Sequence, residues 1–257
     1  MSAADTDSVP VAKIRRIGHL VLFFSRILAN TIPALRRPGL IVRQIYNCGA
    51  RSLIIIMLSG LFVGMVLGLQ GFDLLQRFGS EDALGIAAAL GLLKELGPVV
   101  TALLFAGRAG TSLTSEIGLM KATDQLTAMQ MMAVDPLRHI VVPRFLGGLL
   151  AMPLLAAVFS VIGLFGAQLI GISLMGVDQG AFWSQTQGAV KLSDVTEGII
   201  KSGVFGAACS LVAVYEGYHA TATAEGVGRA TTATVVTSSV LVLLLDYMLT
   251  AAFLTMS

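Results

Sequence analysis

Residues 52–72 constrain the fold most, because they form an apolar run without a charged side chain, SLIIIMLSGLFVGMVLGLQGF. About 20 such residues cross the hydrocarbon core of a bilayer as a helix, and a helix satisfies its own backbone hydrogen bonds there. Four more long apolar runs follow, at residues 84–107, 145–172, 196–215 and 232–254, and three of them contain charged residues. The sequence therefore predicts an all-α polytopic membrane protein with five transmembrane helices.

Composition excludes the main alternative, a water-soluble domain. The chain has 257 residues, of which 55% are hydrophobic and only 12% are charged, whereas soluble domains carry about 25% charged residues. Its two cysteines, Cys48 and Cys209, form no CxxC motif, and three scattered histidines show no ligand spacing. We therefore expect neither a disulfide framework nor a metal site.

The amino-terminal region differs from the rest of the chain. Residues 1–9 are polar and are expected to be disordered, and residues 10–51 are expected to form an interfacial helix and an elbow. The expected apolar stripe of this helix consists of Ile14, Ile17, Val21, Phe24 and Leu28. A basic amphipathic helix lies in the membrane interface. A signal peptide also has a basic start, but Arg26 interrupts the apolar run and no cleavage site follows.

The distribution of Lys and Arg predicts the topology. With a cytoplasmic amino terminus, 13 of the 17 lie on cytoplasmic segments, two (Arg77 and Lys191) lie on the opposite side, and two fall within spans. Positive residues favour the cytoplasmic side, so the carboxyl terminus is expected on the opposite side of the membrane. Residues 52–257 are predicted to form one membrane domain, and residues 173–195 a loop with Trp183 at the membrane surface.

Four charged residues, Lys94, Glu95, Lys201 and Asp246, fall within or at the edge of the predicted spans. Charge in lipid is costly, so such side chains pair, line a wet cavity or reach the interface. Lys94 and Glu95 could form a structural ion pair with a neighbouring helix, and Lys201 could extend to the interface. Asp246 has no partner nearby in sequence, and pairing with Lys201 is one way to neutralise it. Pro98 is expected to disturb the helix near Lys94.

Three glycines in the first span, Gly60, Gly64 and Gly68, are spaced four residues apart. This doubled GxxxG pattern places small residues on one helix face, which lets another helix approach closely. We therefore expect this face to pack against a second span.

Residues 123–133 are predicted to form a short amphipathic helix in a cytoplasmic loop, with Leu126, Met129 and Met132 on one face. Methionine suits a deformable contact surface, and such a helix can occupy a groove in a partner protein. The alternative is a helix that lies on the bilayer. Asp135 followed by Pro136 is expected to start the next helix.

No catalytic motif is recognisable. The chain lacks GxxxxGK[ST], so it has no P-loop for nucleotide phosphates, and no nucleophile, base or carboxylate pair stands at catalytic spacing. We expect a protein that is not an enzyme and binds neither a metal nor a nucleic acid.

The chain resembles the MlaE (YrbE) permease family from about residue 42 to its end. The resemblance rests on VGMVLGLQG at 63–71, ELGPVV at 95–100, LFAGRAG at 104–110, EIGLM at 116–120 and MMAVDP at 131–136. Proteins of this family are membrane subunits of the ABC transporter that moves phospholipid between the inner and outer membranes of Gram-negative bacteria, which maintains outer-membrane lipid asymmetry. The resemblance implies that residues 52–257 form a permease domain in the inner membrane, with the carboxyl terminus in the periplasm. It also implies a homodimer with a cytoplasmic ATPase that binds ATP and Mg²⁺, a STAS-domain regulator and a periplasmic MCE-domain hexamer.

The resemblance also implies where the sites lie. Residues 123–133 match the coupling helix that docks on the ATPase, and Lys201 and Asp246 match charged positions deeper in the bundle. The positions that match the lipid cavity at the dimer centre are Leu67, Leu75, Phe78, Lys94, Glu95 and Leu96. Lys94 stands where Arg is common, and Phe78 where Tyr can stand. Two other functions fit the residues: a proton-coupled transporter using Glu95 and Asp246, and a non-transporting anchor for the MCE complex.

Overall fold

The computed structural model describes residues 9–35 and 38–256, and within these ranges it contains helices and no strand. Five helical segments are long and apolar enough to cross a membrane: Pro38–Gln76, Glu81–Ala122, Leu137–Ser173, Leu192–His219 and Ala224–Thr255. The all-α fold with five spans is therefore confirmed. Each segment extends beyond its predicted apolar run, because helical hydrogen bonding continues into polar residues that need not lie in lipid.

The first two spans are each built from several elements. The amino-terminal half of the chain contains α1 (Val9–Leu35), α2 (Pro38–Cys48), η1 (Ala50–Ser52), α3 (Leu53–Gln76), η2 (Glu81–Ala83), α4 (Leu84–Leu90), η3 (Gly91–Leu96), α5 (Gly97–Phe105), η4 (Ala106–Gly110) and α6 (Thr111–Ala122). The remainder contains α7 (Gln125–Met131), η5 (Leu137–Val141), α8 (Val142–Ser173), α9 (Gln179–Ala189), α10 (Leu192–His219) and α11 (Ala224–Met256). Of the short elements, η3, η4 and η5 are π-helical.

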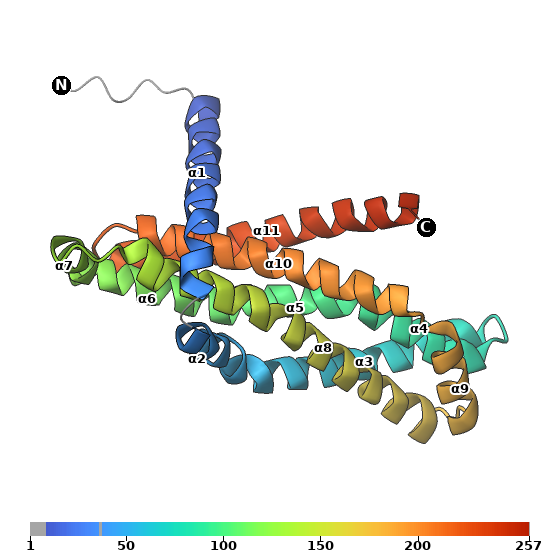
Figure 1. Ribbon diagram of the computed structural model, residues 1–257. Helices are drawn as coiled ribbons and strands as arrows, with labels where there is room; N and C mark the ends of the chain where they lie inside the picture. The colour runs from blue at the N-terminus through green and yellow to red at the C-terminus, as the bar shows by residue number, and fades with distance from the viewer. Residues whose placement is uncertain (1–8, 36–37, 257) are drawn as a thin grey trace.

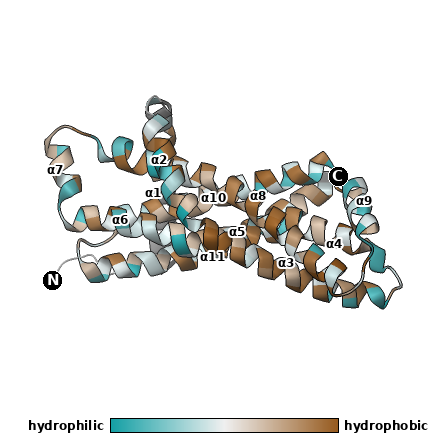
Figure 2. Cartoon of the chain, turned by 90° about the horizontal axis from the view of Figure 1, so that it is seen from below, coloured by the Kyte–Doolittle hydropathy of each residue, from teal (hydrophilic) through white to brown (hydrophobic). Residues whose placement is uncertain are grey.

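The spans lie side by side in one bundle (Figures 1 and 2). The α7 segment lies at one end, and α9 and the carboxyl terminus lie at the other. The largest buried cluster lies within the bundle and includes Leu92, Phe105, Phe159 and Phe205. Helix faces turned away from this core expose large apolar side chains, as along α3 and α11. An apolar exterior over the middle of the bundle is what a bilayer requires (Figure 2).

The glycine face of α3 packs against α8, as the GxxxG spacing predicts. A Cβ atom built on Gly60 would lie 2.9 Å from the carbonyl oxygen of Phe159, and one on Gly68 would lie 3.0 Å from that of Ala167. Between them, a Cβ on Gly64 would meet the carbonyl oxygen of Gly163. The two backbones are thus in direct contact, which only residues without a side chain permit.

The amino-terminal helix contacts the bundle through residues outside the stripe that was predicted to face the membrane interface. Phe23 and Ile27 are buried, and Phe23 packs edge-on against Tyr215 with ring centroids 5.6 Å apart. Val21 and Leu28, from the expected stripe, are exposed. Contact with the bundle includes the middle of α1, at Phe23, and α1 crosses the bundle rather than following it (Figure 1).

Other parts of the amino-terminal prediction have mixed outcomes. Phe24, from the predicted stripe, packs edge-on against Phe145. The side chains of Ile14 and Ile17 are not among those that the structure describes. Residues 1–9 were predicted to be disordered. Of these, residues 1–8 lie outside the described ranges, and Val9 belongs to α1. Part of the expected elbow, residues 38–51, forms α2 and η1, which lead directly into α3.

The predicted loop at residues 173–195 connects two spans, but it contains a helix that the sequence did not indicate, α9, at its centre. Asp178 caps this helix by accepting a hydrogen bond from the Ala181 amide at 2.8 Å. Phe182 is fully buried against Leu84. The polar, Gly- and Gln-rich sequence of α9 gives little helical signal, and its tertiary contact with α4 stabilises the helix instead.

Candidate functional site

The second span is π-helical from Gly91 to Leu96, directly before Pro98. Proline lacks an amide proton, so it leaves a carbonyl of the preceding turn without its helical donor. The hydroxyl of Ser160 on α8 donates to one carbonyl in this region, that of Leu92, at 3.3 Å. The disturbance expected near Lys94 is therefore present, as π-helical turns. Such turns recur at functional sites, and this one carries Lys94 and Glu95.

Lys94 pairs with α10 rather than with its neighbour in sequence. Its Nζ lies 3.1 Å from Oδ1 of Asp194 and 2.9 Å from Oε2 of Glu197. About one third of the Lys94 side chain (34%) is exposed, whereas both carboxylates are more covered. The possibility of an ion pair with a neighbouring helix is thus confirmed for Lys94.

Lys201 forms the centre of a second polar cluster. Lys201 is only 1% exposed. Its Nζ lies 2.8 Å from Oε2 of Glu95, 3.2 Å from Oδ1 of Asp246 and 2.8 Å from Oγ1 of Thr250. The explanation that Lys201 extends to the membrane interface is therefore wrong. Asp246 is paired with Lys201, which is the pairing that the sequence suggested as a way to neutralise it. The pair avoids the cost of an isolated charge within a spanning segment.

The two clusters border one recess between η3, α10 and α11. The recess is lined by Lys94, Glu95, Glu197, Lys201, Thr250, Phe253 and Leu254. Charged groups from η3 and α10 therefore meet a largely apolar wall from α11 within the spanning segments. We call this space the charged recess.

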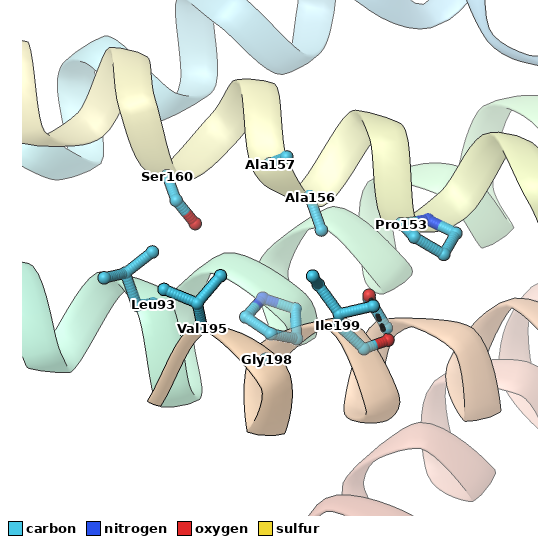
Figure 3. Close-up of a pocket in the computed structure, with 10 residues that line it drawn as sticks. Leu93, Pro153, Ala156, Ala157, Ser160, Val195, Gly198 and Ile199 are labelled. Carbon is cyan, nitrogen blue, oxygen red and sulfur yellow. Dashed lines mark hydrogen bonds between the residues drawn. The ribbon is translucent and has the colours of Figure 1, made fainter. Parts of the chain in front are cut away.

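An apolar groove lies on the other side of the contact between η3 and α10 (Figure 3). It is lined by Leu93 and Pro98, by Pro153, Ala156, Ala157 and Ser160 of α8, and by Val195, Gly198, Ile199 and Ser202 of α10. A Cβ on Gly198 would meet the carbonyl oxygen of Leu93, so the two backbones touch between the groove and the recess. The groove has no charged side chain in its lining.

The six predicted lipid-cavity residues do not line one space within a single chain. Lys94 and Glu95 border the charged recess. Leu67 and Leu96 are partly buried against the central core, and Leu75 packs against the cluster near α9. Phe78 lies beyond the end of α3 and is exposed. A cavity between two copies of the chain stays a prediction.

A family model described as "Permease MlaE" matches residues 41–252 of the chain. The chain belongs to the MlaE permease family. It is 54% identical over 213 residues to the "Intermembrane phospholipid transport system permease protein MlaE" of Haemophilus influenzae, with 82% of each chain covered. It is 35% identical over 237 residues to a "Probable ABC transporter permease protein" of Rickettsia felis, with 92% of each covered.

A more distant relative comes from a plant. The protein TRIGALACTOSYLDIACYLGLYCEROL 1 from the chloroplast of Arabidopsis thaliana is 30% identical over 212 residues, which cover 82% of this chain and 61% of that protein. The two bacterial relatives of this MlaE-family chain are named as permeases, in agreement with the family resemblance.

In this MlaE-family chain, the predicted cytoplasmic helix is shorter than expected and faces differently. It spans Gln125–Met131 and follows Asp124, whose φ of 55° is in the left-handed region and turns the chain back after α6. Leu126 is only 6% exposed, because this turn directs it into the cluster around Ile117 and Ile140. The expectation that Leu126 contacts a partner protein is therefore wrong.

The other methionines of this segment divide between core and surface. Met129 packs against the same cluster as Leu126. Met132 is 68% exposed. Met131, which was not among the residues predicted to contact the ATPase, is 84% exposed. The next helix begins as predicted, since the Leu137 amide donates to Oδ1 of Asp135 at 3.0 Å.

Sequence reasoning missed three members of the polar clusters: Asp194, Glu197 and Thr250. A signal for two of them was available. Asp194, Glu197 and Lys201 stand at i, i+3 and i+7, which is one stripe of a helix. The predicted span began at residue 196, so Asp194 was assigned to a loop, whereas α10 begins at Leu192.

Proposed function

We propose that this chain is the permease subunit of an ABC transporter that moves glycerophospholipids between the inner and outer membranes, driven by ATP hydrolysis on a separate subunit. The observation that carries the proposal is the 54% identity, over 82% of both chains, to a protein named as an intermembrane phospholipid transport permease. The absence of a P-loop motif from the sequence supports a separate ATPase.

The geometry supports a lipid substrate. A phospholipid has an ionic headgroup and apolar tails, so its site must offer both kinds of surface. The charged recess provides paired lysines and carboxylates next to Phe253 and Leu254, at the side of a bundle whose exterior is apolar. This arrangement suits a headgroup that stays polar while its tails remain in an apolar environment.

The assembly that we propose follows the family resemblance. It comprises two copies of this chain in a Gram-negative inner membrane, a cytoplasmic ABC ATPase that binds ATP and Mg²⁺, a STAS-domain regulator and a periplasmic MCE-domain hexamer. The positive-inside distribution supports a cytoplasmic amino terminus. Because α7 and the carboxyl terminus lie at opposite ends of the bundle, the same orientation puts α7 in the cytoplasm and the carboxyl terminus in the periplasm.

The test is purification of the tagged chain with its partners, followed by reconstitution in vesicles that contain a labelled phospholipid. We expect ATP-dependent transfer of the label to an acceptor, unaffected when the proton gradient is collapsed at constant ATP. Loss of transfer on collapse of the gradient would support the proton-coupled alternative that uses Glu95 and Asp246. An MCE complex without any lipid transfer would support the anchor.

A further prediction concerns the docking surface of the ATPase. Met131→Asp together with Met132→Asp is expected to weaken co-purification of the ATPase at least about 100-fold, which needs only about 2.8 kcal/mol. Both side chains are exposed at the α7 end of the bundle, and a carboxylate buried without a partner in an apolar contact is strongly unfavourable. Quantitative pull-down from mild detergent measures the effect.

The matched control for this prediction is Leu174→Asp, because Leu174 is about as exposed as Met132 but follows α8, near α9 at the opposite end of the bundle. It should leave ATPase binding unchanged. Unaltered binding in the Met131 and Met132 variant would instead mean that α7 lies on the bilayer.

A further inference from the structure

We propose that the charged recess selects phospholipids whose headgroup carries a primary ammonium, the ethanolamine class, over phospholipids with an anionic headgroup. This inference rests on the proposed function and adds the headgroup class that the site accepts. It follows from the charge and the hydrogen-bonding capacity of the groups around the recess.

The ion-paired groups around the recess carry excess negative charge. Two lysines, Lys94 and Lys201, pair with four carboxylates, those of Glu95, Asp194, Glu197 and Asp246. Lys191 lies nearby at the start of α10, where its backbone amide donates to Asp194 at 2.9 Å. Its exposed ammonium brings the count to three cations against four anions, and the excess negative charge remains.

The hydrogen-bond donors of the lysines are largely used. An ammonium has three N–H donors, and Lys201 directs them to Glu95, Asp246 and Thr250. Lys94 contacts Asp194 and Glu197, which leaves one donor on a partly exposed side chain. An anionic headgroup would therefore find one spare ammonium donor and several carboxylates that repel it.

Acceptor capacity is in excess. A carboxylate offers about four lone-pair positions. Glu95 and Glu197 line the recess, and Asp246 is paired with Lys201 beside it; all three carboxylates are partly exposed. A primary ammonium can donate three hydrogen bonds to such oxygens and reduce the excess charge, while its phosphate takes the spare donor of Lys94. A quaternary ammonium lacks N–H groups, so choline lipids should be weaker ligands than ethanolamine lipids.

A metal ion is a less suitable occupant than an ammonium group. Among the described residues, no group of three or more His, Cys, Asp or Glu is arranged to hold a metal ion. The carboxylates around the recess are instead spread over η3, α10 and α11 and separated by lysines. Hydrogen-bond acceptors that are spread in this way can each accept from an ammonium group on a flexible headgroup. A metal ion instead needs several oxygen ligands at short distances around one point.

The test measures which lipids the complex retains. The intact permease complex is exchanged into nanodiscs of equimolar ethanolamine, choline and glycerol phospholipids with identical acyl chains, then solubilised, washed and analysed by mass spectrometry. We expect the ethanolamine lipid to be enriched about tenfold over the glycerol lipid, a difference of about 1.4 kcal/mol.

Two substitutions remove the excess charge and keep each lysine paired. Glu197→Gln leaves Lys94 with Asp194, and Asp246→Asn leaves Lys201 with Glu95. The double variant should lose most of the enrichment while assembling normally, and Glu197→Asp should keep it. Glu225→Gln is the control, since this exposed carboxylate pairs with Arg229 at the start of α11.

The outcomes separate this inference from the proposed function. Bound phospholipid without preference for the ethanolamine class would overturn the inference alone, as would full enrichment in the double variant. Absence of any bound or transported phospholipid would overturn both.

Discussion

Lys201→Met is expected to destabilise the bundle strongly, because Glu95 and Asp246 then lose the cation that they share. Removing one partner of a buried ion pair costs about 3–5 kcal/mol. Since Glu95 and Asp246 are partly exposed whereas Lys201 is buried, we expect the lower end of that range. Thermal unfolding of the purified complex in detergent measures the loss, and lipid transfer should fall with it.

A double-mutant cycle tests whether Lys201 and Asp246 act together. Asp246→Asn alone should have a smaller effect than Lys201→Met, because Lys201 keeps Glu95 at 2.8 Å. Combined with Lys201→Met, it should recover part of the loss, since one unpaired carboxylate is removed. Strictly additive defects would mean that the two side chains do not interact in the folded protein.

Gly64→Ala is expected to separate α3 from α8. The added Cβ would meet the backbone carbonyl oxygen of Gly163, which no rotamer change can move away. Overpacking of this kind typically costs about 1–3 kcal/mol, and because the contact is with backbone we expect the upper end. The measurement is again the unfolding temperature in detergent, together with the yield of inserted protein.

Gly203→Ala is the matched control for this substitution. Gly203 lies in α10, and its Cβ would meet nothing within 4 Å. Alanine favours a helix over glycine by about 1 kcal/mol, so this variant should be neutral or slightly more stable. Equal stability of the two variants would show that the contact between α3 and α8 is looser than the structure has it.

The sequence alone determined the class of protein, the number of spans and the glycine face. Each of these follows from a local property: an apolar run long enough for the bilayer predicts a span, and Gly60, Gly64 and Gly68 repeat within a single helix. The motifs between residues 63 and 136 also identified the family. Such features need no knowledge of which helices are neighbours.

Only the tertiary structure decided which partners the charged residues have and which helix faces are buried. Lys94 and Glu95 are adjacent in sequence, yet they join different clusters through residues at least 100 positions away, Asp194 and Lys201. Likewise, Phe23 rather than Val21 packs on the bundle, and Leu126 turns into the core after the left-handed Asp124. A periodic pattern defines the faces of a helix, but the neighbour that covers a face depends on how distant segments pack.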